Sequence, residues 1–207
     1  MTDPLPLEMI HRFIPATPGS TTLLLLHGTG GDENDLIPLG QMVMPGAALL
    51  SVRGSVLENG MPRFFRRIAE GVFDLPDLKR RTQELADFLL QAYGRYGISA
   101  DQVIALGYSN GANIASSVLL SRPEVLAGVA LLRPMVPFVP AALPDLRKKR
   151  VLIAAGKDDP TVPPGQVDQL AELLRKSGAH VTLQVTPGGH GLAQHDVDSV
   201  KAWLKNL

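Results

Sequence analysis

Cysteine is absent from the 207 residues of this chain. Its absence excludes disulfide bonds, thiolate metal sites and a cysteine nucleophile, and it is typical of proteins from a reducing compartment. Aromatic residues make up only 5% of the chain, and neither sign of charge is in excess, since 20 basic side chains balance 20 acidic ones. A net charge of zero gives no indication of a nucleic-acid partner or of electrostatic docking to a membrane.

Long apolar runs are lacking as well. No segment approaches the roughly 20 apolar residues of a membrane span, so we expect no stable membrane insertion. The first residues, 1–4, include an acid and a proline and lead to no long apolar stretch, which argues against a secretory signal. The apolar fraction of 45% is that of a globular protein. We therefore expect a cytoplasmic protein with a single domain, residues 1–207.

Shorter apolar runs recur along the chain, with helical patterns between several of them. The runs are mostly continuous, as expected for parallel strands covered on both faces. They occupy residues 21–26, 47–52, 103–106, 127–132, 151–155 and 181–185, with a candidate edge strand at 9–14. Apolar residues have helical spacing over 82–96, 112–121, 165–177 and the C-terminal segment, where Asp196 is a candidate N-cap. This alternation predicts an α/β fold with a doubly wound, mostly parallel sheet and helices on both faces.

Two longer segments, 53–81 and 133–150, show no regular pattern. Each follows a predicted strand, and long loops in compact domains tend to be functional. In open α/β sheets, ligands bind at the edge where such loops emerge. Both segments are therefore candidate parts of a binding site.

The most informative motif is Gly-Tyr-Ser-Asn-Gly at residues 107–111, which reads G-x-S-x-G. It lies between the predicted strand 103–106 and the predicted helix 112–121. A serine on such a sharp turn projects its hydroxyl from the sheet edge, where a substrate carbonyl can reach it. The flanking glycines remove Cβ atoms that would clash in a tight turn. Ser109 is therefore the candidate nucleophile.

A serine nucleophile needs a base to take its proton and an acid to orient that base. His190 lies in a glycine-rich turn directly after the strand 181–185 and is the candidate base, with His195 in reserve. A lone histidine on a loop is otherwise most often a solvated surface residue. Asp158 and Asp159 both follow the strand 151–155, and either can serve as the acid. The order serine, aspartate, histidine is that of the α/β-hydrolases.

An oxyanion hole requires two N–H donors aimed at the carbonyl oxygen of the substrate. One candidate is the backbone N–H of Asn110, directly after the nucleophile. The other is the backbone N–H of Thr29, in the glycine-rich loop 27–32 after the strand 21–26. A phosphate-binding loop is the competing interpretation, but the segment lacks the lysine of a P-loop and does not match G-x-G-x-x-G.

Together these motifs resemble the carboxylesterase/phospholipase family of small α/β-hydrolases, which includes the acyl-protein thioesterases. The pieces that carry the resemblance span nearly the whole chain and are residues 27–33, 53–54, 107–112, 159–163 and 189–190. The stretch 61–67 further resembles a bacterial branch of hydroquinone-linked carboxylesterases. The resemblance implies an α/β-hydrolase fold, and it selects Asp159 as the acid because family members place the acid directly before the proline.

The chain departs from the family pattern at two places. Asn110 stands where the family commonly has glutamine, which leaves the backbone donor unchanged but alters the side chain beside it. The turn after the fourth family strand, which usually contains glycine, is replaced by residues 133–137, Arg-Pro-Met-Val-Pro. This second departure bears on the choice of substrate.

We therefore expect a serine hydrolase that cleaves carboxylic esters or thioesters of small molecules through an acyl-enzyme. Its catalytic residues would be Ser109, Asp159 and His190, with minimal or no lid and no metal or organic cofactor. Candidate pocket residues, for which core packing is an equal alternative, are Phe64, Phe65, Met135, Val136 and Phe138. Other acyl bonds (lactone, lysophospholipid, peptide) and a catalytically silent binding protein are the alternatives. A homodimer is a candidate assembly.

Overall fold

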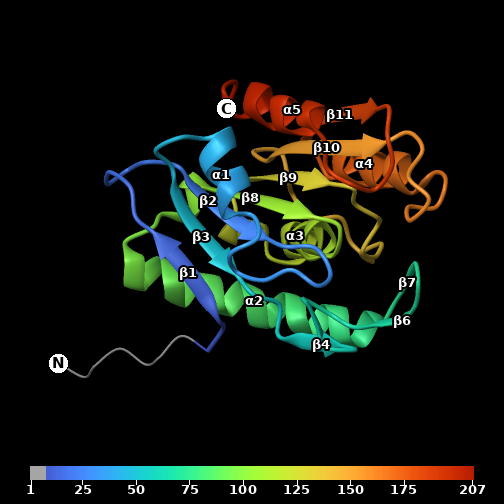
Figure 1. Cartoon of the computed structure of the whole chain (residues 1–207), viewed down its shortest axis with the longest axis horizontal. Coiled ribbons are helices and arrows are strands. Elements are labelled where there is room, and N and C mark those ends of the chain that lie inside the picture. Colours follow the sequence, from blue (N-terminus) through green and yellow to red (C-terminus); the bar gives the residue numbers. More distant parts are fainter. Residues whose placement is uncertain (1–7) are drawn as a thin grey trace.

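In the computed structural model, which describes residues 8–207, a seven-stranded sheet forms the centre of the molecule (Figure 1). The strand order is β1-β3-β2-β8-β9-β10-β11. All neighbours pair in parallel except β1, which is antiparallel to β3. The strands are β1 (His11–Ile14), β2 (Thr22–Leu26), β3 (Ala48–Val52), β8 (Val103–Tyr108), β9 (Gly128–Leu132), β10 (Arg150–Gly156) and β11 (His180–Thr186). The predicted doubly wound, mostly parallel sheet is thus confirmed.

Helices cover both faces of this sheet. They are α1 (Ile37–Val43), α2 (Leu75–Tyr96), α3 (Asn110–Ser121), α4 (Gln166–Lys176) and α5 (Gln194–Leu204), with short 3-10 turns at Ala100–Gln102 and Pro123–Val125. Side chains alternate between the two faces of a strand. Leu24 of β2 therefore packs with α2, α3 and α4, whereas its neighbour Leu25 packs with α1 and α5. This explains why the strands read as continuous apolar runs.

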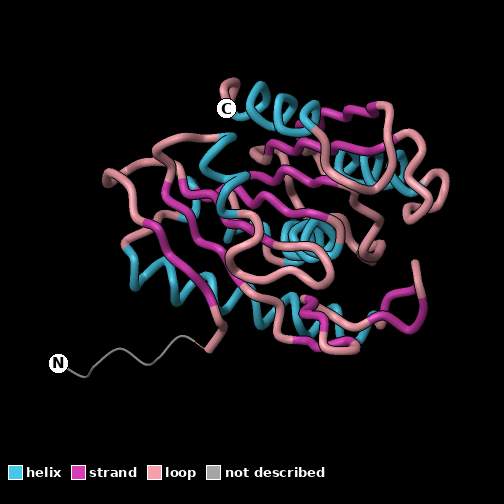
Figure 2. The backbone as a smooth tube through the Cα atoms, viewed as in Figure 1, coloured by secondary structure: helices cyan, strands magenta, loops and turns pink. Residues whose placement is uncertain are grey.

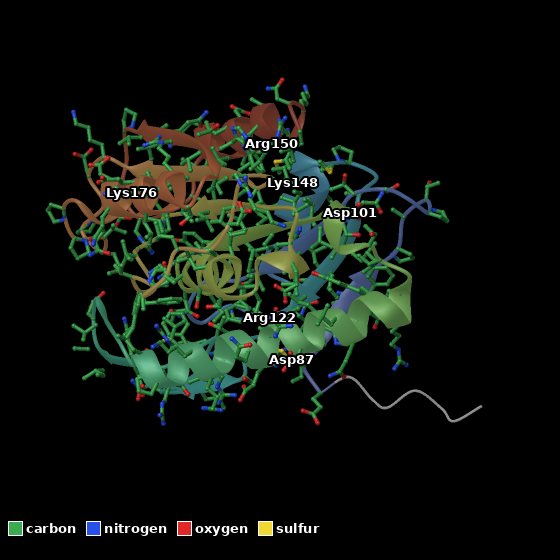
Figure 3. The ribbon with its side chains drawn as sticks, turned by 180° about the vertical axis from the view of Figure 1, so that it is seen from behind. Asp87, Asp101, Arg122, Lys148, Arg150 and Lys176 are labelled. Carbon is green, nitrogen blue, oxygen red and sulfur yellow. The ribbon has the colours of Figure 1, made fainter. Side chains whose placement is uncertain are left out.

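The strand order reverses at the centre of the sheet. From β2 the chain runs to β3 on one side, and from β8 it runs to β9 on the other. Loops after such strands diverge to opposite faces and leave a crevice at the carboxyl ends of the strands. The loops after β2, β8, β10 and β11 all emerge at this edge. The basic residues Lys148 and Arg150 lie at the opposite edge, where β10 begins (Figure 3).

The segment 53–81 is more regular than the sequence indicates. It forms two small hairpins, β4 (Val56–Glu58) with β5 (Met61–Arg63) and β6 (Arg67–Ala69) with β7 (Val72–Phe73), which lie apart from the main sheet beside α2 (Figure 2). The prediction that the following helix begins at residue 82 is wrong, because α2 begins at Leu75. Asp74 caps it by accepting the N–H of Asp77 at 3.1 Å. The first two turns of α2 were not predicted because most of their residues are charged.

Two further elements differ from the sequence prediction. Helix α1 was not predicted, since it has only 7 residues and no side-chain cap. The expected N-cap role of Asp196 is also wrong. Asp196 lies at the third position of α5 and reaches back to accept the N–H of Ala193 at 2.8 Å.

Candidate active site

Ser109 lies at the junction of β8 and α3 in a strained backbone conformation. Its φ of 53° and ψ of −114° are rare for a residue with a side chain, and such a conformation costs about 1–3 kcal/mol. Its N–H donates to the carbonyl of Leu132 at the end of β9, at 2.8 Å. The surrounding sheet therefore holds the strained turn in place.

Close packing leaves room only for glycine on either side of this turn. A Cβ on Gly111 would overlap the carbonyl oxygen of Leu26, and a Cβ on Gly107 would overlap the backbone of Gly111. The first turn of α3 thus lies directly against the end of β2. This contact brings the turn that carries Ser109 next to the loop that carries Thr29.

A chain of hydrogen bonds links three residues that follow β8, β10 and β11. Ser109 Oγ lies 2.9 Å from His190 Nε2, and His190 Nδ1 lies 2.8 Å from Asp159 Oδ2. The second carboxylate oxygen of Asp159 accepts the N–H of Thr161 at 2.8 Å. The side chain of Asp159 is only 3% exposed, whereas His190 is 24% exposed. Geometry of this kind lets the hydroxyl pass its proton to an imidazole that a carboxylate holds in place.

The two alternative residues, Asp158 and His195, lie outside this chain of hydrogen bonds. Asp158 is exposed, and its N–H donates to the carbonyl of Gly188. His195 lies in the first turn of α5, with Nε2 3.6 Å from Asp196 Oδ2. The chain of hydrogen bonds therefore joins Ser109 to His190 and Asp159, and it includes neither alternative residue.

Strand β5 and the residue that follows it anchor the segments of both candidate oxyanion donors. The carbonyl of Pro62 accepts the N–H of Gly30 at 2.9 Å, and Arg63 Nη1 donates to Thr29 Oγ1 at 2.7 Å. On the other side, the N–H of Phe64 donates to Asn110 Oδ1 at 2.7 Å. One short segment, residues 62–64, thus holds the Thr29 loop and the start of α3 together. No sequence motif indicates this arrangement.

The buried histidine His27 holds the start of the loop that carries Thr29. Its Nδ1 lies 2.6 Å from the carbonyl of Gly28, and its Nε2 lies 2.9 Å from the N–H of Gly54. A carbonyl can only accept and an N–H can only donate, so the ring must be neutral with its proton on Nδ1. Burial lowers the pKa of His27 below its ordinary value. The sequence places His27 at the start of the glycine-rich loop 27–32, but it does not reveal these two contacts.

Because the pKa of His27 is lower in the folded state, we expect acid to destabilise the protein through this residue. Below about pH 6.5 the unfolded chain binds a proton at this position that the folded chain excludes, so the free energy of unfolding falls as pH falls. The slope is at most about 1.4 kcal/mol per pH unit and ends at the lowered folded pKa. Urea unfolding between about pH 5 and pH 7, compared with His27→Gln, measures it. Equal slopes for the two proteins would contradict the assignment.

The five candidate pocket residues lie at different depths. Phe64, Phe65 and Met135 are buried, at most 7% exposed, whereas Val136 and Phe138 are half-buried against the same core. Val136 and Phe138 therefore have the most surface left for a substrate. A role in substrate binding stays a prediction for all five.

The described part of the chain holds neither a cluster of metal ligands nor a membrane-spanning helix. Within residues 8–207, no three His, Asp or Glu side chains gather as a metal site requires. No helix in that part of the chain is long and apolar enough to cross a membrane.

Known proteins share this architecture over almost the whole chain. The phospholipase/carboxylesterase family matches residues 12–207. A putative hydrolase of Bacillus subtilis (strain 168), MhqD, is 51% identical over 183 residues, which cover 88% of this chain and 92% of that protein.

Two solved structures extend the likeness to three dimensions. A carboxylesterase of Bacillus cereus has a TM-score of 0.93 and 46% identity, covering 96% of this chain and 94% of its own. A carboxylesterase from Mesorhizobium loti has a TM-score of 0.89 and 36% identity, covering 100% of this chain and 98% of its own.

Proposed function

The chain belongs to the phospholipase/carboxylesterase family of α/β-hydrolases, and from that premise we propose that it cleaves carboxylic esters through an acyl-enzyme on Ser109. The observation that carries the proposal is the hydrogen-bonded chain from Ser109 Oγ through His190 to Asp159, with distances of 2.9 and 2.8 Å. In this role Ser109 is the nucleophile, His190 the general base and Asp159 the orienting acid.

In the acylation step, Ser109 Oγ attacks the carbonyl carbon of the ester while His190 Nε2 takes the hydroxyl proton. The carbonyl oxygen becomes an oxyanion in a tetrahedral intermediate. When this intermediate collapses, the bond to the alcohol oxygen breaks, and His190 returns the proton to the departing alcohol. The acyl group then remains on Ser109. Asp159 stabilises the charged imidazole that forms in between.

Deacylation repeats the same proton transfers with water. Water attacks the acyl carbon as His190 accepts one of its protons, and collapse of the second intermediate releases the carboxylic acid. The proton passes back to Ser109 Oγ, which restores the free enzyme. Water is the only co-reactant that this sequence needs.

The N–H groups of Thr29 and Asn110 are the proposed oxyanion donors. Asn110 begins α3, so its N–H is one of the groups at a helix start that lack a partner within the helix. Thr29 follows β2, whose residue Leu26 pairs with Gly107 of β8. The two loops therefore leave neighbouring strands at the same level. The hydrogen bonds from residues 62–64 support this role because they fix both loops before substrate binds.

Thioesters, lactones, lysophospholipids and peptides offer the same carbonyl chemistry, so the substrate class needs a direct experiment. We would measure turnover of p-nitrophenyl esters of graded chain length beside acyl-thioesters and lysophospholipids. We expect hydrolysis of p-nitrophenyl esters by the wild-type protein in the presence of a metal chelator. Binding of these compounds by the folded protein without turnover would instead support a catalytically silent binding protein.

A further inference from the structure

The side chain of Arg133 lies buried behind the loop that carries His190. Arg133 directly follows β9, is only 1% exposed and is among the largest fully buried side chains of the described residues. Its φ of 56° is in the left-handed region, which is strained for a residue other than glycine. The acyl-transfer steps do not by themselves require a buried cation at this position.

Every N–H of the guanidinium has an acceptor. Nη1 and Nη2 donate to the two carboxylate oxygens of Asp196, at 2.9 and 2.8 Å. Nε donates to the carbonyl of Gly189 at 2.9 Å, Nη2 to that of Gly191 at 3.3 Å, and Nη1 to that of Ala154 at 3.2 Å. These bonds account for all five donors of an arginine. One side chain therefore connects the end of β10, the start of α5 and the loop between β11 and α5.

The carbonyls of Gly189 and Gly191 are those on either side of His190. The intervening carbonyl, that of His190, accepts the hydroxyl of Tyr108 at 3.1 Å. The loop is rich in glycine, whose backbone is the most flexible, and Gly188 and Gly191 are exposed. Ordering such a loop therefore has an entropic cost. Arg133 and Tyr108 together hold three consecutive carbonyls of it in place.

We propose that Arg133, with Asp196 as its counter-ion, is a positioning residue that holds the imidazole of His190 in line with Ser109. The proposal rests on the function proposed above for His190. A buried ion pair is seldom more stable than well-packed apolar residues, so stability alone is a weak reason for this pair. A displacement of about 1 Å at a reacting group, by contrast, can lower the rate by about 100-fold.

Two substitutions separate positioning from simple stabilisation. Arg133→Lys keeps a positive charge beside Asp196 but cannot hold both glycine carbonyls, because a single ammonium group lacks the planar fork. The double variant Arg133→Met, Asp196→Leu removes both charges, so that neither is left unpaired in the interior. For both variants we expect kcat to fall by about tenfold or more on folded protein, with KM within about threefold of wild type. Labelling by a fluorophosphonate should slow by a similar factor.

Arg147→Lys is the matched control, since Arg147 forms an exposed ion pair with Asp145 away from the site, and its kcat should equal that of wild type. A role in stability alone predicts a normal kcat for every folded molecule. A decrease in kcat of less than about tenfold in either folded variant, or a change in KM alone, would therefore overturn the positioning role. If the double variant does not fold, the kcat of Arg133→Lys decides. Absence of Ser109-dependent hydrolysis in the wild-type protein would instead refute the proposed function itself.

Discussion

Replacement of Ser109 by alanine should abolish ester hydrolysis and leave the fold intact. The Oγ atom contacts His190 Nε2 at 2.9 Å, and alanine keeps the Cβ and the backbone bond from residue 109 to Leu132. Loss of a serine nucleophile that acts together with a histidine and an aspartate lowers kcat by about 10⁶-fold. We therefore expect kcat for a p-nitrophenyl ester to fall by about that factor, with an unchanged circular dichroism spectrum and melting temperature.

Ser121→Ala is the matched control, since Ser121 is an exposed residue at the other end of α3. It should retain wild-type kcat. Activity of Ser109→Ala within about 100-fold of wild type would contradict the assignment, because the remaining binding interactions cannot replace a nucleophile.

The second large effect is expected for Asp159→Asn. The oxygen Oδ1 of Asp159 accepts the N–H of Thr161, while Oδ2 faces His190 Nδ1. If asparagine keeps its oxygen toward Thr161, its NH₂ group faces Nδ1 and donates to it. The histidine proton then moves to Nε2, which can no longer accept a proton from Ser109. An exchange of this kind lowers kcat by about 10⁴-fold.

Asp158→Asn controls for the change of charge at the neighbouring position. Asp158 is exposed, and only its backbone N–H has a partner in this loop, the carbonyl of Gly188. We expect its kcat within about tenfold of wild type, a change of at most about 1.4 kcal/mol in the barrier. The opposite ranking, measured on proteins of matched thermal stability, would assign the orienting role to Asp158.

The central sheet was predictable because its strands are covered on both faces. Runs such as residues 23–26 must be apolar throughout when successive side chains enter two different cores. Helix α1 could not be predicted, since seven residues that include Pro38 and Gly40 show no clear period. The two hairpins of residues 56–73 were missed because their strands have only two or three residues each.

Within the candidate site, the residues that belong to local sequence motifs were predictable. The contacts between distant parts of the chain were not. Ser109, Asp159 and His190 each follow a strand, so their approach at one sheet edge follows from the topology. The choice of Asp159 over its neighbour came from family resemblance. Arg133 contacts a residue 56 positions away in the sequence, and His27 contacts one 27 positions away. No local motif encodes such contacts. The family, the fold and the hydrolase class are confirmed, while the catalytic roles stay predictions.

We propose that catalysis proceeds through a covalent intermediate on Ser109. Mass spectrometry of the folded protein after reaction with a fluorophosphonate, followed by peptide mapping, can detect a covalent adduct at this residue. We expect one adduct per chain, on the peptide that contains Ser109, and no adduct on Ser109→Ala. An adduct on a different residue, or folded wild-type protein that hydrolyses esters without any labelling, would contradict an acyl-enzyme on Ser109.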